Sequence, residues 1–333
     1  MEYKNLGKAG IKVSTIALGT LNFGTSVAEA DAINIIHAAV DSGINFIDTA
    51  NLYGKVDFLS SDDFTGVGRA EEITGKALKG IRHSVVLATK AEPQVGPGIN
   101  DRGLSRRHLM QSVESSLRRL QTDHVDVFYA HAPDYSTPIE ETLRALDDMV
   151  HQGKVRYIGL SNYRAWQLCK ALWTSDKCNL ARFDCIEIAY NLIARSPEYE
   201  LLPLCLEEGV GITVWAPLAG VLLSGKYIGY DPSQPPPSGT RAYPGLWKQE
   251  NFEAVARLNQ VAEASGCSLS RFSLAWLLHA DAVTSVICGV SSKKQLEDNL
   301  AAVEIKLSKE DLAACDEVLE KLCPTPNMRY GWL

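Results

Sequence analysis

Short runs of hydrophobic residues alternate with longer amphipathic segments along most of this chain. Each run is rich in β-branched or aromatic residues, which is typical of strands that are buried on both faces. We therefore expect eight strands, at Thr15–Gly19, Ile44–Ala50, Val85–Lys90, Val125–His131, Val155–Ser161, Cys185–Asn191, Gly211–Leu218 and Ser285–Val290.

The segments between these runs have the periodicity and the start signals of helices. Residues 28–41 place apolar side chains on one face, and Ser105 stands where it can cap the helix that follows it. Thr137 and Glu140 match a capping box, with Pro138 at the expected first helical position. Two further helices, at about 252–264 and 268–280, are predicted before the last strand.

Eight strand–helix units, joined by connections too long for hairpins, predict an α/β fold of the parallel (β/α)8 or TIM-barrel type. A doubly wound parallel sheet is the alternative, but the G-x-G-x-x-G motif of a dinucleotide-binding sheet is absent after the first strand. Lys4–Ser14 has the pattern of a hairpin that plugs the barrel floor. We expect a single domain over residues 1–333, because α/β barrels commonly reach this length.

Two connections, Gly54–Gly68 and about 222–250, are longer than the others. Both follow strands, so we expect both at the C-terminal face of the barrel, where active sites are built. The first should contribute to the substrate wall through Asp57, Phe58, Asp62, Asp63 and Phe64.

Composition and charge narrow the class of protein. Hydrophobic residues make up 46% and charged residues 22% of the chain, which excludes a disordered or fibrous protein. The formal net charge is −7 without runs of like charge, so we expect neither nucleic acid nor a membrane as a partner. No targeting signal or membrane-spanning stretch is evident, and the cysteines lack metal-ligand spacing, so we expect a cytoplasmic protein without a metal.

Polar residues follow three consecutive predicted strands at equivalent positions. Asp48, Lys90 and His131 lie at the ends of the second, third and fourth strands, and Tyr53 lies just beyond Asp48. Neighbouring strands are ~4.8 Å apart, so these side chains can meet in one small volume. Taken singly, each has an ordinary structural interpretation: an ion pair for Asp48 and Lys90, packing for Tyr53, and a hydrogen-bonded structural residue for His131.

These residue types suit proton transfer to a carbonyl oxygen. A tyrosine with an ordinary pKa of about 10 is a poor acid at neutral pH, and a nearby ammonium should lower that pKa. We therefore expect Lys90 to tune Tyr53 as the acid. Asp48 should keep Lys90 charged, while His131 should donate to a substrate oxygen and orient it. Such a set requires a separate hydride donor.

Two further segments have features of a cofactor site. Residues 220–226 match G-x-x-x-x-G-K, but Tyr227 replaces the Ser or Thr of a P-loop, so we do not expect a nucleoside triphosphatase. The glycines and Lys226 still suit a pyrophosphate, or they form a plain turn. Ser161 and Asn162 follow the fifth strand and can hold a carboxamide or cap the next helix.

Together, these motifs resemble the aldo-keto reductase family over nearly the whole chain, and in particular its bacterial members and potassium-channel β subunits. The matching segments are Gly19-Thr20, Asn45–Ala50, Tyr53-Gly54, Ala88–Lys90, Asp126–His131, Gly153–Asn162, Tyr190-Asn191, Trp215–Gly220 and Gln295–Asn299. The resemblance implies that Asp48, Tyr53, Lys90 and His131 form the catalytic tetrad, with Tyr53 as general acid in reduction and general base in oxidation. It also implies hydride transfer, without a metal, between a nicotinamide dinucleotide and an aldehyde, ketone or sugar-like substrate.

The resemblance further implies which residues hold the cofactor. Ser161 and Asn162 would contact the carboxamide, and Trp215 would stack on the nicotinamide ring. Glu187 departs from the family, which usually has Gln there, because a carboxylate accepts from an amide but cannot donate to it. The full expected set is Gly19, Thr20, Asp48, Ser161, Asn162, Glu187, Trp215, Pro217, Leu218, Gly220, Lys226, Arg241, Gly289, Ser291, Lys293, Gln295, Asp298 and Asn299.

The choice of cofactor depends on few residues. Gly289, Val290 and Ser291 stand where NADPH-dependent relatives often carry basic residues, which favours NAD(H). Lys293 or Arg241 can instead reach a 2′-phosphate, and relatives with a similar loop are NADP-dependent. We expect NADP(H) by a small margin.

Other functions remain open at this point. The chain can be a nicotinamide-binding regulatory subunit of a partner protein, or a lyase that uses Lys90 as a Schiff-base nucleophile. The sequence does not determine the substrate or the reaction direction. It also does not determine whether the protein is a monomer or a homo-oligomer, or what the aromatic tail Met328–Leu333 does.

Overall fold

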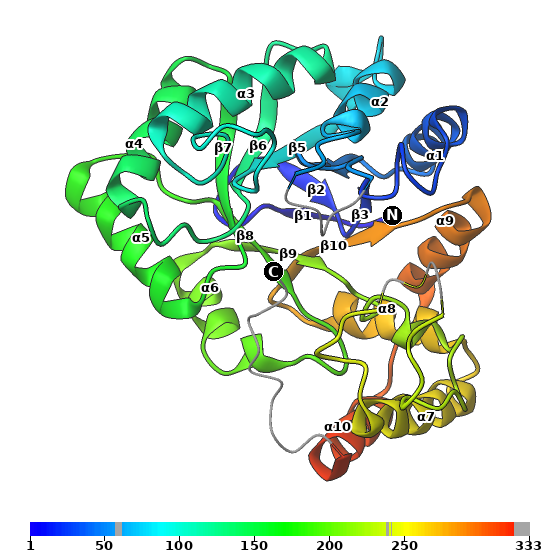
Figure 1. The fold of residues 1–333 in the computed structure, drawn as a ribbon. Coiled ribbons are helices and arrows are strands. Elements are labelled where there is room, and N and C mark those ends of the chain that lie inside the picture. Colours follow the sequence, from blue (N-terminus) through cyan, green and yellow to red (C-terminus); the bar gives the residue numbers. More distant parts are fainter. Residues whose placement is uncertain (57–61, 238–239, 241, 323–333) are drawn as a thin grey trace.

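The computed structural model describes residues 1–56, 62–237, 240 and 242–322. It contains a closed barrel of parallel strands in the order β10-β3-β4-β5-β6-β7-β8-β9, surrounded by helices (Figure 1). The predicted (β/α)8 barrel is therefore confirmed and the doubly wound sheet is wrong. The barrel strands are β3 (Ile16–Gly19), β4 (Phe46–Asp48), β5 (Val86–Ala91), β6 (Val125–Ala130), β7 (Val155–Ser161), β8 (Cys185–Ala189), β9 (Gly211–Trp215) and β10 (Val283–Gly289).

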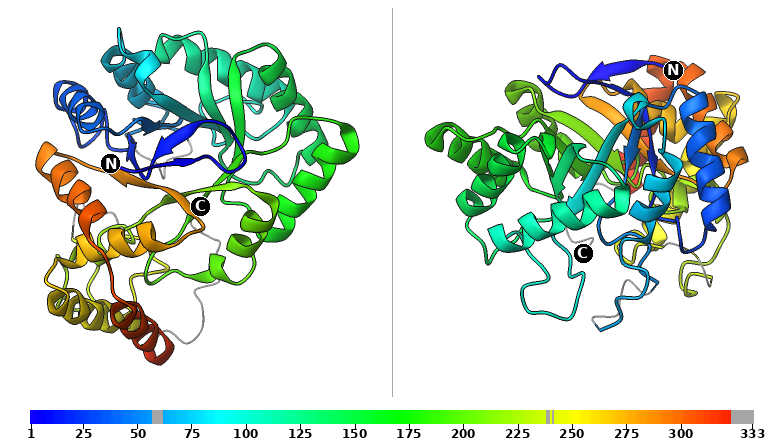
Figure 2. Two further views of the ribbon diagram at one scale, coloured as in Figure 1. Left: turned by 180° about the vertical axis from the view of Figure 1, so that it is seen from behind. Right: turned by 90° about the horizontal axis from the view of Figure 1, so that it is seen from above.

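An N-terminal hairpin closes one end of the barrel, as predicted. Its strands β1 (Tyr3–Asn5) and β2 (Lys12–Ser14) pair antiparallel. They lie at the end opposite to the long loops (Figure 2). Leu6, Ala9 and Val13 of the hairpin pack with the side chains that fill the barrel interior. The rim that a ligand can approach is therefore the one formed by the C-terminal ends of the strands.

Helices connect the strands and cover the outside of the barrel (Figure 1). None of the helices in the described ranges is both long enough and apolar enough to cross a membrane. The α-helices are α1 (Glu29–Asp41), α2 (Arg69–Ala77), α3 (Arg106–Leu120), α4 (Ile139–His151), α5 (Ala165–Cys178), α6 (Leu201–Glu208), α7 (Gln249–Ala264), α8 (Leu269–His279), α9 (Lys293–Leu300) and α10 (Lys309–Leu322). Short 3-10 helices are η1 (Arg82–Ser84), η2 (Ser196–Glu198), η3 (Leu222–Ser224) and η4 (Ala301–Glu304).

The helix starts follow the sequence signals only in part. Ser105 caps α3, because its hydroxyl accepts a hydrogen bond from a backbone amide one turn later. The capping box predicted at residues 137–140 is wrong: Pro138 is itself the N-cap of α4, and no side chain caps this helix. The Thr137 hydroxyl donates instead to Asp134 at 2.6 Å. The helix begins one residue later than the pattern predicts, so Thr137 lies before the N-cap and its hydroxyl is directed at Asp134.

Side-chain alternation places charged residues at the open rim. Successive residues of a strand point to opposite faces, so the residue two positions beyond an inward side chain also points inward. Along β4, β5 and β8, this position is occupied by Asp48, Lys90 and Glu187. The inward residues that precede them are apolar and fill the middle of the barrel: Phe46, Ala88 and Cys185.

The long connection after β4 lies between the end of that strand and α2. In its described part, the ammonium of the buried Lys55 lies 5.2 Å from the ring centre of Phe64, and Asp63 accepts from the backbone amide of Thr65. Asp57 and Phe58 lie outside the described residues, as does the tail 328–333. The substrate-wall role of this connection stays a prediction.

Candidate active site

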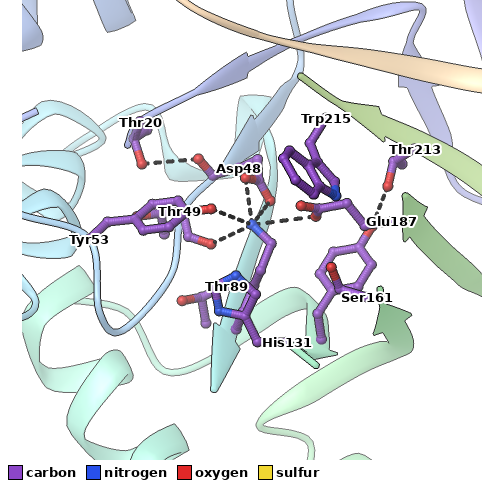
Figure 3. Close-up of polar contacts among 12 residues, drawn as sticks. Thr20, Asp48, Thr49, Tyr53, Thr89, His131, Ser161, Glu187, Thr213 and Trp215 are labelled. Carbon is purple, nitrogen blue, oxygen red and sulfur yellow. Dashed lines mark hydrogen bonds and ion pairs between the residues drawn. The ribbon is translucent and has the colours of Figure 1, made fainter. Parts of the chain in front are cut away.

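The Lys90 ammonium lies at the centre of the open rim. Its Nζ lies 2.6 Å from both carboxylate oxygens of Asp48 and donates to the backbone carbonyl of Thr49 at 3.1 Å (Figure 3). Strand register sets this geometry. Asp48 pairs with Ala88 on the neighbouring strand β5, and Lys90 is the next residue of β5 whose side chain points to the same face as that of Ala88. The structure thus brings together the ends of the second and third predicted strands.

Tyr53 and His131 lie beside this ion pair and nearer the solvent. The Tyr53 hydroxyl is 3.5 Å from Lys90 Nζ, and the rings of Tyr53 and His131 meet edge to face with centres 6.0 Å apart. Both are only partly buried, whereas Asp48 and Lys90 are buried. All four residues that the sequence singled out therefore share one cluster, with the two rings on its accessible side.

Burial and charge set the protonation of this cluster. Burial raises the pKa of Tyr53 above its ordinary value and outweighs the Lys90 ammonium, which acts in the expected, lowering direction. Burial disfavours the charged form of Lys90, but Asp48 and Glu187 outweigh it and hold the pKa of Lys90 above its ordinary value. Burial, together with the Lys90 charge, lowers the pKa of His131 to about 3, so its imidazole is neutral at neutral pH.

Glu187 adds a second carboxyl group to the cluster. Its Oε2 lies 3.3 Å from Lys90 Nζ, and its side chain is 3% exposed. Burial and then the charge of Asp48 raise the pKa of Glu187 to about 8, which favours the protonated form of this side chain. A protonated carboxyl has a donor as well as an acceptor. A protonated Glu187 therefore offers both hydrogen-bonding roles of the glutamine that the family usually has there, and the expected contact of this position with a carboxamide stays a prediction.

The residues expected around a carboxamide form one hydrogen-bonded unit. Trp215 Nε1 donates to Asn162 Oδ1 at 3.0 Å. Asn162 Nδ2 in turn donates to the backbone carbonyl of His131 at 3.0 Å and to the Ser161 hydroxyl at 3.1 Å. Ser161 and Asn162 do not cap the next helix, because the N-cap of α5 is Arg164. Their polar groups face the rim instead of a helix end.

The backbone of this rim adopts an uncommon conformation at three non-glycine residues. The φ angles of Asn162, Ala216 and Ala219 are 63°, 51° and 53°. In the described chain, the other non-glycine residues with positive φ are Gln121 and Asn179, which end helices α3 and α5, where this conformation is common. No helix end explains the first three, and such strain is typical of binding sites.

The other expected cofactor residues follow β3, β9 and β10 around the same rim. The Thr20 amide and hydroxyl both donate to the backbone carbonyl of Asp48 at 3.0 Å. Gln295 accepts from the Ser291 amide at 2.8 Å, and Asp298 pairs with Arg271 at 2.6 Å. The exposed members of the expected set are Lys226, Gly289, Ser291, Lys293 and Gln295. The half-buried members are Leu218, Gly220 and Asp298, and the buried ones are Gly19, Pro217 and Asn299. Arg241 lies outside the described residues.

The structure also adds residues that the sequence analysis missed. The ring of Tyr129 lies 5.8 Å from Lys90 Nζ, and Tyr243 packs edge to face on Trp215 with ring centres 6.0 Å apart. Alternation along β6 carries a signal for Tyr129, since it lies two positions before His131. Tyr243 belongs to an irregular loop, in which spacing predicts no neighbour.

A polar atom in this cluster remains available to a ligand. Within the described ranges, His131 Nδ1 is buried without a hydrogen-bond partner, and Glu187 Oε2 is buried with no hydrogen bond besides its ion-pair contact with Lys90 at 3.3 Å. A buried unpaired polar atom costs about 1–3 kcal/mol, so His131 Nδ1 suits a polar group of an organic ligand. Across the same ranges, no group of three or more His, Cys, Asp or Glu side chains is placed to hold a metal.

Comparisons with known proteins point to one family. Residues 15–320 match the model of the Aldo/keto reductase family. The chain is 38% identical over 315 residues to a probable voltage-gated potassium channel subunit beta of Arabidopsis thaliana, and 34% identical over 314 residues to one of Oryza sativa subsp. japonica. Each match covers 92% of both chains. The chain is also 37% identical over 343 residues, spanning both chains completely, to the uncharacterized oxidoreductase YrpG of Bacillus subtilis (strain 168).

Proposed function

Because this chain belongs to the aldo/keto reductase family, we propose that it transfers hydride between a nicotinamide cofactor and the carbonyl or alcohol carbon of an aldehyde, ketone or sugar-like substrate. Family membership and the oxidoreductase relative support an oxidoreductase activity. One observation carries the proposal of carbonyl–alcohol chemistry: the buried ammonium of Lys90 lies 2.6 Å from the Asp48 carboxylate and 3.5 Å from the Tyr53 hydroxyl.

Tyr53 acts as general acid in reduction and as general base in oxidation. Burial raises the pKa of its phenol, so the reaction needs a group that stabilises the phenolate as it forms. Lys90 is that group, because an ammonium at hydrogen-bond distance favours the phenolate. Asp48 keeps Lys90 charged and fixes the direction of its amine.

His131 binds and orients the substrate oxygen. Its imidazole is neutral because its pKa is lowered to about 3, so one ring nitrogen donates and the other accepts. A neutral donor polarises a carbonyl without repelling the Lys90 ammonium.

The nicotinamide, when bound, supplies the hydride. We assign its carboxamide to Ser161, Asn162 and Glu187 and its ring to the face of Trp215, which a hydrogen bond to Asn162 holds in place. The buried Glu187 carboxyl at the rim and the strained backbone at Asn162 support this fit. The residues after β3, β9 and β10 would hold the rest of the dinucleotide. We propose NADP(H) over NAD(H), with Lys293 and Arg241 as candidate partners of a 2′-phosphate.

Replacement of Tyr53 by Phe tests this proposal. We expect kcat to fall by about 10²-fold or more, because the variant lacks only the transferable proton. Turnover is followed by nicotinamide absorbance in both directions with a panel of aldehydes, ketones and sugars, using NADPH and NADH. Cofactor Kd, measured by protein fluorescence, should stay nearly unchanged. A Tyr53→Phe variant with wild-type kcat would remove Tyr53 as the acid, and a strong preference for NADH would overturn the cofactor choice.

The names of two relatives favour a second candidate function, a nicotinamide-binding regulatory subunit of a partner protein. The same panel separates the two candidates. A regulatory subunit binds the cofactor but leaves every substrate of the panel unconverted.

A further inference from the structure

Two carboxyl groups face a single ammonium inside the barrel (Figure 3). Asp48 makes both of the 2.6 Å contacts with Lys90, and Glu187 lies 3.3 Å from the same Nζ. The Lys90 side chain is 0% exposed and the two carboxyl side chains are each 3% exposed, so water does not screen them. With both acids ionised, the cluster would carry one unbalanced negative charge, which is costly in a buried site.

The surroundings of Glu187 provide no second cation among the described residues. Its neighbours in register on β7 and β9, Ser161 and Thr213, are uncharged. The titratable groups that face it are Asp48 of β4, Tyr53 after β4, Lys90 of β5, Tyr129 of β6 and Cys185 of its own strand, while His131 after β6 faces Lys90. Because the imidazole is neutral, Lys90 supplies the one positive charge. A bound proton is what balances the second acid.

We propose that Glu187 is a proton-carrying positioning residue, a neutral carboxylic acid that donates a hydrogen bond to Asp48 and leaves the Lys90 ammonium directed at Asp48 and Tyr53. The direction of this bond follows from the neighbours. Burial raises the pKa of Asp48 as well, but both of its oxygens lie 2.6 Å from the ammonium, against 3.3 Å for Glu187, so Asp48 is the acid better placed to hold the negative charge and Glu187 the one to hold the proton. The protonation of Glu187 does not depend on which activity the protein has, whereas its effect on turnover rests on the proposed function.

Loss of this proton changes the cluster in two ways. Glu187 becomes a second carboxylate that attracts the ammonium, so Lys90 is divided between two acids and is less available to Tyr53. The new negative charge on Glu187 also raises the pKa of Tyr53, because a nearby carboxylate disfavours the phenolate. Both effects oppose a phenolate at Tyr53. Turnover should therefore fall, in either direction, as the pH rises through the titration of Glu187.

Glu92 provides a matched control for the proton itself. Burial raises the pKa of Glu92 to about 7, in the vicinity of Arg102 and Asp134, and that of Glu187 to about 8. NMR of protein labelled with ¹³C at the glutamate carboxyls should show two signals that titrate far above the ordinary range for glutamate. Glu187→Gln should remove one signal and Glu92→Gln the other. This measurement requires neither cofactor nor substrate.

The activity of the same variants tests the positioning role. Glu187→Gln retains an N–H that can donate to Asp48 but has no proton to lose. We expect wild-type kcat/KM to approach a tenfold loss per pH unit above about pH 8, as for any essential protonated group. The Glu187→Gln variant should lack this alkaline limb, whatever its kcat/KM at pH 7, because its amide has no proton to lose, and Glu92→Gln should retain the wild-type profile.

Two results would overturn the proposal: a Glu187 carboxyl that titrates in the ordinary glutamate range, or an alkaline limb that Glu187→Gln leaves unchanged. A chain without turnover on the panel would contradict the proposed function instead, and the NMR titration would then decide the protonation of Glu187 by itself.

Discussion

At the scale of single residues, Lys90 shows how a charge is kept inside a barrel. Burial opposes its charged form, and the Asp48 carboxylate at 2.6 Å is the counter-charge that outweighs this cost, with the Glu187 carboxyl 3.3 Å away. Removing one partner of a buried pair leaves the other uncompensated, which typically costs about 3–5 kcal/mol. Stability and activity therefore depend on the same residues here, and a single substitution cannot separate them.

A double variant separates the two contributions. We expect Lys90→Met to lower the free energy of unfolding by about 3 kcal/mol, because Asp48 loses its counter-charge. Asp48→Asn combined with Lys90→Met should recover much of this loss, since it removes the orphaned carboxylate. Neither protein should regain turnover, because both lack the ammonium beside Tyr53. Urea unfolding at pH 7 gives the first quantity and nicotinamide absorbance the second. A double variant that is no more stable than Lys90→Met would contradict this account of the ion pair.

At the scale of elements, the two helices α1 and α3 begin in different ways. The side chain of Ser105 caps α3, whereas the N-cap of α1 is Ala28, which has a suitable extended conformation but no side-chain acceptor. Unpaired amides at a helix start reduce stability unless a side chain or water satisfies them. The two sites therefore predict changes of opposite sign.

We expect Ser105→Ala to lower the free energy of unfolding by about 1 kcal/mol and Ala28→Ser to raise it by about 0.5–1 kcal/mol. Ala28 is exposed, so the new hydroxyl should not disturb the packing around it. Urea unfolding of both variants measures the effect, and kcat should be unchanged for Ala28→Ser. If the two changes have the same sign, capping does not control these helix starts.

At the scale of the whole molecule, the hairpin lies at the end of the barrel opposite to the long loops (Figure 2), whereas the site residues lie at the C-terminal ends of the strands. The hairpin approaches the strands so closely that a Cβ at Gly7 would lie 2.5 Å from the amide nitrogen of Gly211, and φ at Gly7 is +62°. Gly10, in the same hairpin, has no atom within 4 Å of such a Cβ. Substitutions at these two glycines therefore distinguish the effect of close packing on stability from the effect of backbone flexibility.

We expect Gly7→Ala to lower the free energy of unfolding by at least about 2 kcal/mol, through contact with backbone atoms and a strained φ. Gly10→Ala should change it by less than about 1 kcal/mol. At a temperature where both remain folded, kcat should match wild type because the hairpin lies far from the rim. Thermal unfolding and kcat test this, and equal effects of the two substitutions would show that the hairpin does not seal the barrel.

The pattern of the chain was sufficient for the architecture and for part of the site. Eight short apolar runs separated by helical segments predict the closed barrel, because parallel strands need such crossovers. Asp48, Lys90 and His131 were predictable as neighbours since consecutive parallel strands end at the same rim. The period of two along each strand determined which side chains point inward.

Tertiary structure alone decided what these residues face and how they are charged. Glu187 reaches Lys90 from β8, a strand that does not pair with β5, and no local spacing predicts contact across a barrel. The pKa of Tyr53 rises instead of falling because burial outweighs the ammonium, and the extent of burial is a property of the packed molecule. Thr137 likewise donates to Asp134 instead of capping α4. Sequence periodicity is a local property of the chain, whereas charge balance and desolvation depend on every neighbour that folding brings together.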